Sequence, residues 1–149
     1  MGGTSFPTSN KMVRCGNAVA VGTSTLDGDG VDTSGFREVT FIVAFGAITD
    51  GTPNVHVQGS DDDAATDAYS DLAASEVDTL DTDDNKLVSV TVRVAEKKWN
   101  RVQITRGGST GSVVDGIIAV LSLPTVMPVV QDASVAVLGN QYRPAEGTK

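Results

Sequence analysis

Strict alternation of apolar and polar residues is the feature that most constrains the fold of this chain. Positions 87–95 read LVSVTVRVA, with a valine at every even position from 88 to 94 and Ser, Thr or Arg between them. Successive side chains of an extended strand point to opposite faces, so this pattern predicts a strand with one apolar face and one wet face. The turn-like EKKWN at 96–100 and a second alternating run at 101–105 follow. Together these segments predict an antiparallel β-hairpin.

Several other segments have the same β-like character. REVTFIVAFGAIT at 37–49 alternates in the same way, and the β-branched run VVDGIIAVLS at 113–122 predicts a strand that is buried on both faces. GGSTGS at 107–112 predicts a turn, because glycines supply the positive φ angles that hairpins need. Shorter strand candidates lie at 17–22, 54–58 and 133–139. Seven or eight strands separated by Gly-, Asp-, Ser- and Thr-rich turns predict an all-β sandwich or barrel.

The charge of the chain is concentrated in one segment. Residues 61–84 carry ten Asp or Glu and no Lys or Arg, within a chain of net charge −8. The rest of the chain carries eleven basic and only nine acidic side chains. ATDAYSDLAASEV at 65–77 predicts one short helix or an acidic loop that closes one end of the sandwich, since its apolar residues recur at helical spacing on an acidic surface. We expect a solvated surface feature here and no nucleic-acid partner, because cations for phosphates and aromatic rings for bases are both scarce.

The residues that most often carry chemistry are isolated in this sequence. His56 lies within an alternating segment, which predicts an exposed histidine that points away from the core. Cys15 lies at the edge of a candidate strand with no nearby base, which predicts a small, half-buried thiol. One histidine and one cysteine are too few for a zinc site, and no GxSxG elbow accompanies the histidine. We therefore expect no catalytic residue, no cofactor and no metal site, and we do not expect an enzyme.

Calcium is the strongest alternative to that expectation. In LDGDGVDTSGFRE, Asp27, Asp29 and Glu38 occupy positions one, three and twelve of an EF-hand-like count. Position six holds Asp32 where an EF-hand needs glycine, so the stretch predicts a flexible hairpin loop first and a weak ion site second. The acidic runs at 60–67 and 81–85 leave the same alternative open.

The length of 149 residues suits one domain. The longest apolar run, Ile117–Leu121, is far below the roughly 18 residues of a membrane helix, so no membrane contact is expected. The N-terminus lacks the pattern of a signal peptide and the single cysteine provides no internal disulfide, so we expect synthesis in a cytoplasm. Gly-, Ser- and Pro-rich ends predict an N-terminal arm at 1–15, a β-sandwich domain at 16–138 and a C-terminal tail at 139–149.

The middle of the chain, from about 36 to 128, resembles the head decoration, or cement, proteins of tailed bacteriophages. The resemblance is carried by FIVAFGAITDGTPNVHVQGSDD, by DDNKLVSVTV and by KKWNRVQITRGGSTGSVVDGIIAVLSLP, in that order. The matching positions are Asp50–Gly51, Val55–Gln58, Ser60–Asp62, Arg101–Thr105 and Gly107–Gly111. Trp99 departs from the pattern, which has a tyrosine two residues before the arginine.

The resemblance implies a jelly-roll-like β-sandwich that binds the outer surface of the capsid shell and stabilises it. Its implied partners are the major capsid protein and further copies of itself, as a dimer or trimer, and its implied location is the outside of the virion. A receptor- or carbohydrate-binding β-sandwich of a phage fibre is the alternative function. The candidate contact residues are Phe6, Met12, Trp99, Arg101, Tyr142 and Arg143.

Overall fold

A computed structural model describes residues 5–93 and 96–136 of the chain. These residues form one short helix, α1 (Phe6–Ser9), and eleven strands. In chain order the strands are β1 (Lys11–Gly16), β2 (Val19–Gly22), β3 (Leu26–Asp27), β4 (Val31–Asp32), β5 (Phe36–Ile48), β6 (Asn54–Ser60), β7 (Ser70–Asp71), β8 (Val77–Asp78), β9 (Leu87–Arg93), β10 (Trp99–Thr105) and β11 (Ser112–Pro124). The predicted all-β fold is confirmed.

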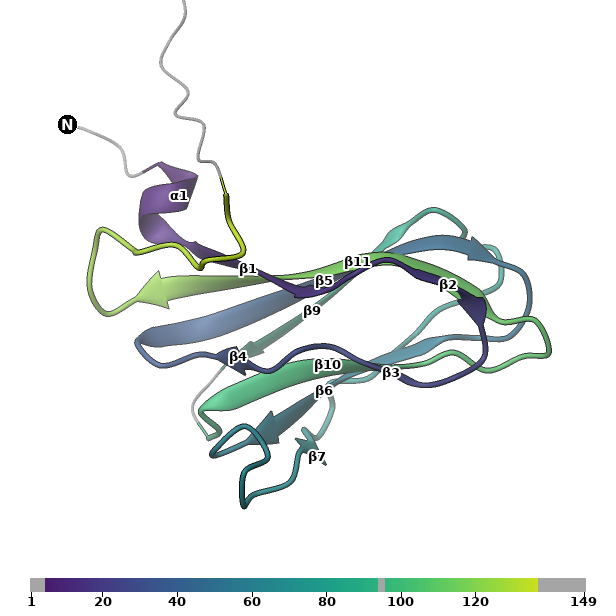
Figure 1. Ribbon diagram of the computed structural model, residues 1–149, viewed down its shortest axis with the longest axis horizontal. Coiled ribbons are helices and arrows are strands. Elements are labelled where there is room, and N and C mark those ends of the chain that lie inside the picture. Colours follow the sequence, from purple (N-terminus) through teal and green to yellow (C-terminus); the bar gives the residue numbers. More distant parts are fainter. Residues whose placement is uncertain (1–4, 94–95, 137–149) are drawn as a thin grey trace, which may run out of the picture.

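The strands form two antiparallel sheets that stack as two layers (Figure 1). Sheet A has the order β1-β11-β5-β9, and β2 also pairs with β11. Sheet B has the order β3-β10-β6-β7, with β4 paired to β10 and β8 paired to β6. The predicted β-sandwich is therefore confirmed.

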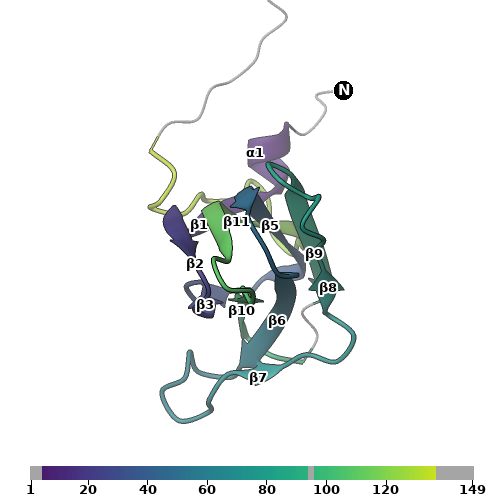
Figure 2. The same ribbon diagram turned by 90° about the vertical axis from the view of Figure 1, so that its right-hand side faces the viewer.

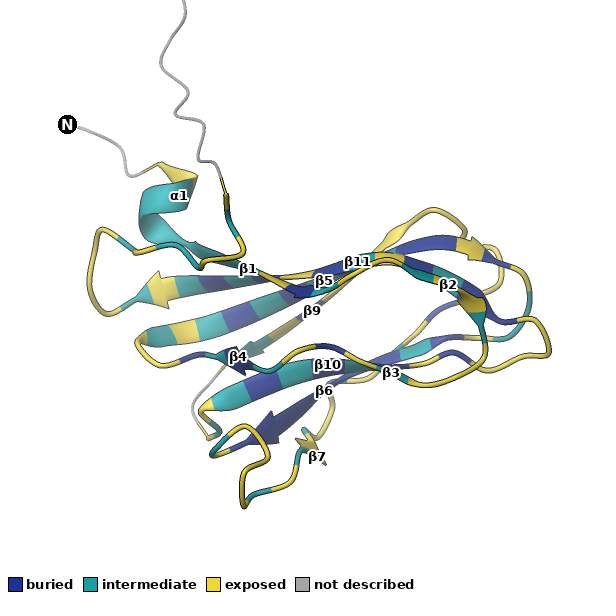
Figure 3. Ribbon diagram, viewed as in Figure 1, coloured by how far each residue is buried: buried dark blue, intermediate teal, exposed yellow. Residues whose placement is uncertain are grey.

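The core lies between the two sheets and follows the alternation in the sequence. Val39, Phe41 and Val43 of β5 are fully buried, as are Val102 and Ile104 of β10, and all five belong to one hydrophobic cluster. Alternate residues of these strands change between buried and less buried, as the bands along β5 and β10 show (Figure 3). Burial of each such side chain contributes about 1.5–3 kcal/mol before the loss of chain entropy is counted.

The predicted hairpin of the segments at 87–95 and 101–105 is wrong. β9 pairs with β5 in sheet A, where Glu38 is opposite Arg93. β10 pairs with β6 in sheet B, where Trp99 is opposite Ser60. Each strand has one apolar face that must be buried. Two strands bury such faces equally well as neighbours in one sheet or when they face each other across a core. The connection between them therefore joins the two layers.

Of the two predicted forms of 65–77, the helix is wrong and the loop is observed. The segment contains turns and the short strand β7, and Ala74 adopts a positive φ angle that no α-helix contains. Side-chain oxygens of Ser60 and Asp62 accept hydrogen bonds from backbone N–H groups of residues 62–67. Short polar side chains that bind nearby backbone in this way compete with a helix.

β11 was expected to be buried on both faces, and only one face is. Ile117, Ala119 and Leu121 are buried in the core, whereas Ile118 on the opposite face is 46% exposed. The expected strand at 133–139 is not formed in its described part, 133–136, and the remainder lies outside the described residues.

The stretch that was expected to be a hairpin loop, at 27–32, is an interrupted edge of sheet B. β3 and β4 both pair with β10, and between them the backbone N–H of Gly28 donates to the carbonyl of Val102 at 2.8 Å. Glycine permits this close approach, since a Cβ on Gly28 would lie only 3.2 Å from the side chain and the carbonyl oxygen of Val102. The stretch is therefore held against the body.

The described part of the predicted N-terminal arm lies on the body, because it contains α1 and most of β1. β1 pairs with β11 along sheet A, with Met12 opposite Val120. Among the described residues, no helix is long and apolar enough to cross a membrane.

Candidate functional site

The two outer faces of the sandwich differ in chemistry. Sheet B carries polar side chains that β7 covers, and β7 with the loop before it lies on the side away from sheet A (Figure 2). Sheet A carries apolar side chains on its outer face. Each face is a candidate contact surface. The two faces differ in whether their side chains already have partners within the chain.

His56 is the centre of the polar face of sheet B. The ring points away from the core, as predicted, but it is only 7% exposed, so the prediction of an exposed histidine is wrong. Its Nδ1 lies 2.9 Å from Oδ1 of Asn54, and its Nε2 lies 3.1 Å from Oε1 of Gln103. The cause of the burial is β7, which folds back and places Oδ1 of Asp71 at 3.3 Å from Nε2.

A closed ring of side-chain contacts continues from this histidine across the sheet. Gln103 donates to Asp27 at 2.6 Å, Arg101 donates to Gln58 at 2.9 Å, and Gln58 donates to Asp71 at 2.8 Å. An ion pair of 3.3 Å between Arg101 and Asp27 completes the ring. These groups satisfy one another, which favours a structural role for this face.

Arg101 also makes a cation–π contact with Tyr69. Its guanidinium lies 4.3 Å from the centre of the Tyr69 ring, and the Tyr69 hydroxyl donates to Asp63 at 2.6 Å. Burial raises the pKa of Tyr69, and the hydrogen bond to Asp63 raises it further, so the hydroxyl remains a donor at neutral pH. Arg101 therefore stabilises the face of sheet B.

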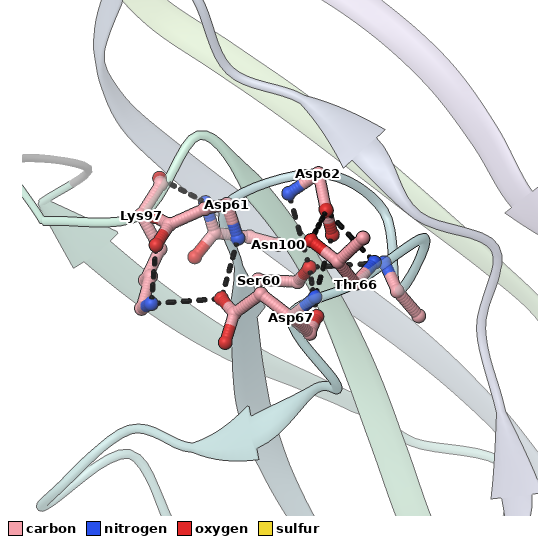
Figure 4. A network of polar contacts seen from close by, with 8 residues as sticks. Ser60, Asp61, Asp62, Thr66, Asp67, Lys97 and Asn100 are labelled. Carbon is pink, nitrogen blue, oxygen red and sulfur yellow. Dashed lines mark hydrogen bonds and ion pairs between the residues drawn. The ribbon is translucent and has the colours of Figure 1, made fainter.

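The acidic loop, residues 60–67, is organised by hydrogen bonds and one cation (Figure 4). Lys97 donates to Asp61 and to Asp67, each at 2.8 Å, and these contacts raise the pKa of Lys97. The contact from Lys97, followed by the backbone N–H of Asp61, lowers the pKa of Asp67. Asp62 accepts backbone N–H groups of Thr66 and Asp67 at 2.8 and 3.0 Å. The carboxylates of this loop thus have partners within the chain.

The calcium alternative gains no support from the geometry. Asp27 belongs to sheet B, whereas Glu38 belongs to β5 of sheet A and accepts a hydrogen bond from Ser122 at 3.1 Å. Within the described ranges, no group of three or more His, Cys, Asp or Glu side chains converges on one point.

Cys15 is fully buried in the core, deeper than the half-buried position that was predicted. Burial, followed by the charge of Asp29, raises the pKa of its thiol to about 12. The thiolate is the reactive form of cysteine, so this side chain behaves as a small core residue.

The outer face of sheet A has an apolar centre that the strand register defines. Ile118 of β11 is opposite Ile42 of β5, Val120 is opposite Met12 of β1, and Ala44 is opposite Leu87 of β9. Leu87 is 70% exposed. We call the face formed by these six residues the apolar face.

A hollow of about 700 Å³ opens on the apolar face. Gly16 and Gly116 contribute no side chains to it, and Leu87 and Val135 stand at its border. A Cβ on Gly116 would meet only the carbonyl oxygen of Gly16, at 3.6 Å, so the space above this glycine is open.

The free edge of β1 is covered by the segment that follows β11. The backbone N–H of Met12 donates to the Gln131 side chain at 2.9 Å, and that of Arg14 donates to Ser134 at 3.0 Å. Side chains that occupy edge N–H groups prevent another strand from pairing there. A partner on this side of the molecule therefore meets the face of sheet A.

A second apolar surface lies at the end of the molecule that carries α1. α1 contacts the segment after β11, because the backbone N–H of Val129 donates to the carbonyl of Thr8 at 3.0 Å. The exposed large apolar side chains here form what we call the end patch: Phe6, Leu123, Val126, Met127 and Val130.

The structure does not bring the predicted contact residues together. Phe6 belongs to the end patch, Met12 to the apolar face, and Trp99 and Arg101 to sheet B, where Trp99 is half-buried with Lys98 Nζ at 5.7 Å from its ring. Tyr142 and Arg143 lie outside the described residues. Ile42, Leu87 and Ile118 were not among the contact residues predicted from the sequence. The apolar residues on both faces of 113–122 were a signal from which an apolar contact surface could have been predicted.

Comparison with known proteins gives a likeness of fold. No protein-family model matches this chain, and no curated protein matches it. One similar solved structure is the SPBc2 prophage-derived protein YomS, at 14% identity over 75% of this chain and 93% of that chain, with a TM-score of 0.48. Another is the PBSX exported protein XepA, at 12% identity over 95% of this chain and 46% of that chain, with a TM-score of 0.53.

Both similar structures are phage-derived. The chain spans about half the length of XepA. The likeness to XepA therefore concerns the sandwich fold of a part of that protein.

Proposed function

We propose that this chain is a structural virion protein of a tailed phage, which decorates the outer surface of the capsid shell and stabilises it without catalysis. The observation that carries the proposal is the end patch, where five large apolar side chains of α1, β11 and the segment after β11 are exposed at one end of the sandwich. Clustered apolar exposure marks an interaction site more often than a solvent face. The sequence resemblance to decoration proteins supplies the capsid as the partner, and the likeness of fold to the phage-derived XepA agrees with a phage protein.

A decoration protein needs a stiff body and contacts repeated over a lattice. The two-layer core supplies the stiffness, and weak contacts at many equivalent positions add up through multivalency. The acidic loop lies on the far side of sheet B and faces solvent in this arrangement, where its charge keeps decorated particles apart. The partner of the end patch is the major capsid protein.

The test is co-sedimentation of the purified protein with assembled heads that lack it, with the bound copies counted per particle. We expect many copies at a fixed ratio to the capsid protein, and we expect Val126→Asp to reduce binding at least tenfold. Leu80→Asp is the matched control, because Leu80 is an exposed leucine on the acidic segment. A handful of copies at the tail would contradict the proposal and favour a fibre module. If Val126→Asp binds heads as tightly as the wild type does, the end patch is not the surface that contacts the capsid.

A further inference from the structure

We infer that a second copy of this chain covers the apolar face, so that two copies pack sheet A against sheet A about a two-fold axis parallel to the strands. The starting observation is β11, whose sequence predicts burial on both faces while the structure buries one. Ile118 and Leu87 remain exposed at 46% and 70%. No described residue covers the centre of this face, so a second layer completes the burial.

The face is complementary to itself in shape. One row across the sheet runs from Leu87 through Ala44 to Gly116, with Gly16 close by on β1. A large side chain thus stands at the β9 edge, and the hollow lies towards the β1 edge of the same row. A two-fold axis along the strands exchanges β9 with β1 and β5 with β11. It therefore places Leu87 of each copy over the hollow of the other.

The same rotation matches the next row of the face. Ile118 and Ile42 are opposite each other in the register, on the two central strands that the axis exchanges. Ile118 of one copy therefore meets Ile42 of the other at the centre of the interface. Self-complementarity of one patch is the property that an isologous dimer requires.

The size of the face is sufficient for a stable contact. The four strands have six, thirteen, thirteen and seven residues, and at about 3.3 Å per residue and about 4.8 Å per strand they give a face of roughly 600 Å². Stable interfaces bury about 600–1,000 Å² on each partner. Two sheets can also pack face to face at about 10 Å, as they do inside β-sandwiches.

Electrostatics permit this approach although each chain has a net charge of −8. The four carboxylates of the acidic loop lie on the side of sheet B that is away from sheet A, so a sheet A contact places them on the two outer sides of the dimer. Near the apolar face both signs are present, with Arg14 and Arg93 of one sign and Glu38 and Asp115 of the other. The two acidic loops are therefore far apart in this orientation, which reduces the repulsion between them.

The test is sedimentation equilibrium of the purified protein without heads, so that its failure is separate from failure of the shell proposal. We expect the wild type to have about twice the chain mass of 15.4 kDa. Leu87→Asp is expected to weaken self-association at least tenfold. Leu80→Asp, at an exposed leucine that is not one of the six residues of the apolar face, is expected to leave it unchanged.

Gly116→Val provides a second variant that fills the hollow and adds no charge. Its side chain would enter open space, so we expect an unchanged circular dichroism spectrum and the loss of dimer. A monomeric wild type at 100 µM, on the order of the concentrations at which weak complexes form, would overturn the inference, because the chain's own C-terminal segment or another protein would then cover the face. A dimer that survives both Leu87→Asp and Gly116→Val would also overturn it.

Discussion

At the scale of single residues, Arg106 is the clearest case of a charge with a structural role. The side chain is 4% exposed, and it donates from Nε to the carbonyl of Ser24 and from Nη1 to the carbonyls of Ala20 and Ser112, at 2.8, 2.8 and 2.9 Å. One guanidinium thus ties together the connection from β2 to β3 and the start of β11. A fork of fixed geometry suits this task better than the single ammonium of lysine.

We predict that Arg106→Met lowers the free energy of unfolding by about 2–4 kcal/mol, since buried carbonyls are left without donors. Arg93→Met, at an exposed position on β9, is the matched control and should change it by less than about 0.5 kcal/mol. Urea denaturation measures both values. Equal effects of the two substitutions would show that the buried contacts of Arg106 are unimportant.

Asp50 makes the stability of the protein sensitive to acid. Backbone N–H groups of Gly111, Ser109 and Thr110 donate to its carboxylate and hold its pKa below the ordinary value of 3.8. The unfolded chain therefore takes up a proton at a higher pH than the folded chain does. The stabilisation is complete above the ordinary pKa and is lost as the pH falls through the lower, folded-state value.

We predict that Asp50→Asn makes the fall in unfolding free energy between pH 5 and 2, roughly the range in which paired carboxylates titrate, shallower than in the wild type. Asp81→Asn removes a carboxylate from an exposed turn, with no bond to the glycine turn, and serves as the control. Urea denaturation at a series of pH values gives the slopes. A slope for Asp50→Asn as steep as that of the wild type would contradict the assignment.

Whether a polar residue is buried was difficult to predict from the sequence. His56 and Arg106 are polar residues in or beside alternating strands, and that position predicts exposure. Both are buried because segments distant in sequence fold over them, β7 over the histidine and the β2–β3 connection over the arginine. A local sequence pattern does not indicate that a distant segment will cover a residue. Cys15, by contrast, was expected to be half-buried, and it lies deeper than predicted.

At the scale of elements, the glycine turn between β10 and β11 shows how a short motif is constrained. Gly107, Gly108 and Gly111 all have positive φ angles, so the turn predicted from GGSTGS is confirmed. Their surroundings differ, however. A Cβ on Gly111 would collide with the carbonyl of Gly22, whereas a Cβ on Gly107 would meet nothing within 4 Å.

We predict that Gly111→Ala lowers the unfolding free energy by about 3 kcal/mol, from left-handed strain and a backbone clash that cannot relax. Gly107→Ala should cost about 1 kcal/mol, because only the backbone strain applies. Thermal and urea unfolding of the pair measure the difference. Equal losses would mean that the collision at Gly111 relaxes freely.

The acidic loop depends on Lys97, the cation that joins two of its carboxylates. We predict that Lys97→Met speeds amide hydrogen exchange in residues 61–67, because Asp61 and Asp67 then repel each other. Lys86→Met removes a cation that pairs only with Asp83 in the described residues and is the control. The difference should shrink in high salt. Unchanged exchange in Lys97→Met would show that backbone hydrogen bonds alone order the loop.

Element types were largely predictable, and element partners were not. The alternation at 87–95 and 101–105 gave two correct strands, yet it contains nothing that distinguishes a hairpin from a crossing between layers. The false helix at 65–77 arose from apolar spacing alone, while Ser and Asp side chains that bind backbone decided the structure. The apolar face was likewise present in the sequence as an excess of apolar residues, without any sign of which surface they would form.

At the scale of the whole molecule, the chain separates its surfaces by chemistry. Sheet B carries a satisfied polar face beneath the acidic segment, sheet A carries the apolar face, and one end carries the end patch. We assign the last two surfaces to different partners, a second copy and the capsid protein. Substitutions in one surface should therefore leave binding at the other intact when both proteins are present at saturating concentration.

Stabilisation of the shell is the central claim, and the release of DNA from full heads on heating tests it most directly. The measurement compares heads that lack this protein with the same heads after saturation by the purified chain, by the fluorescence of a dye that reports free DNA. We predict that the decorated heads release their DNA at a higher temperature, and that Val126→Asp gives no increase. Release at the same temperature with and without fully bound protein would contradict the claim.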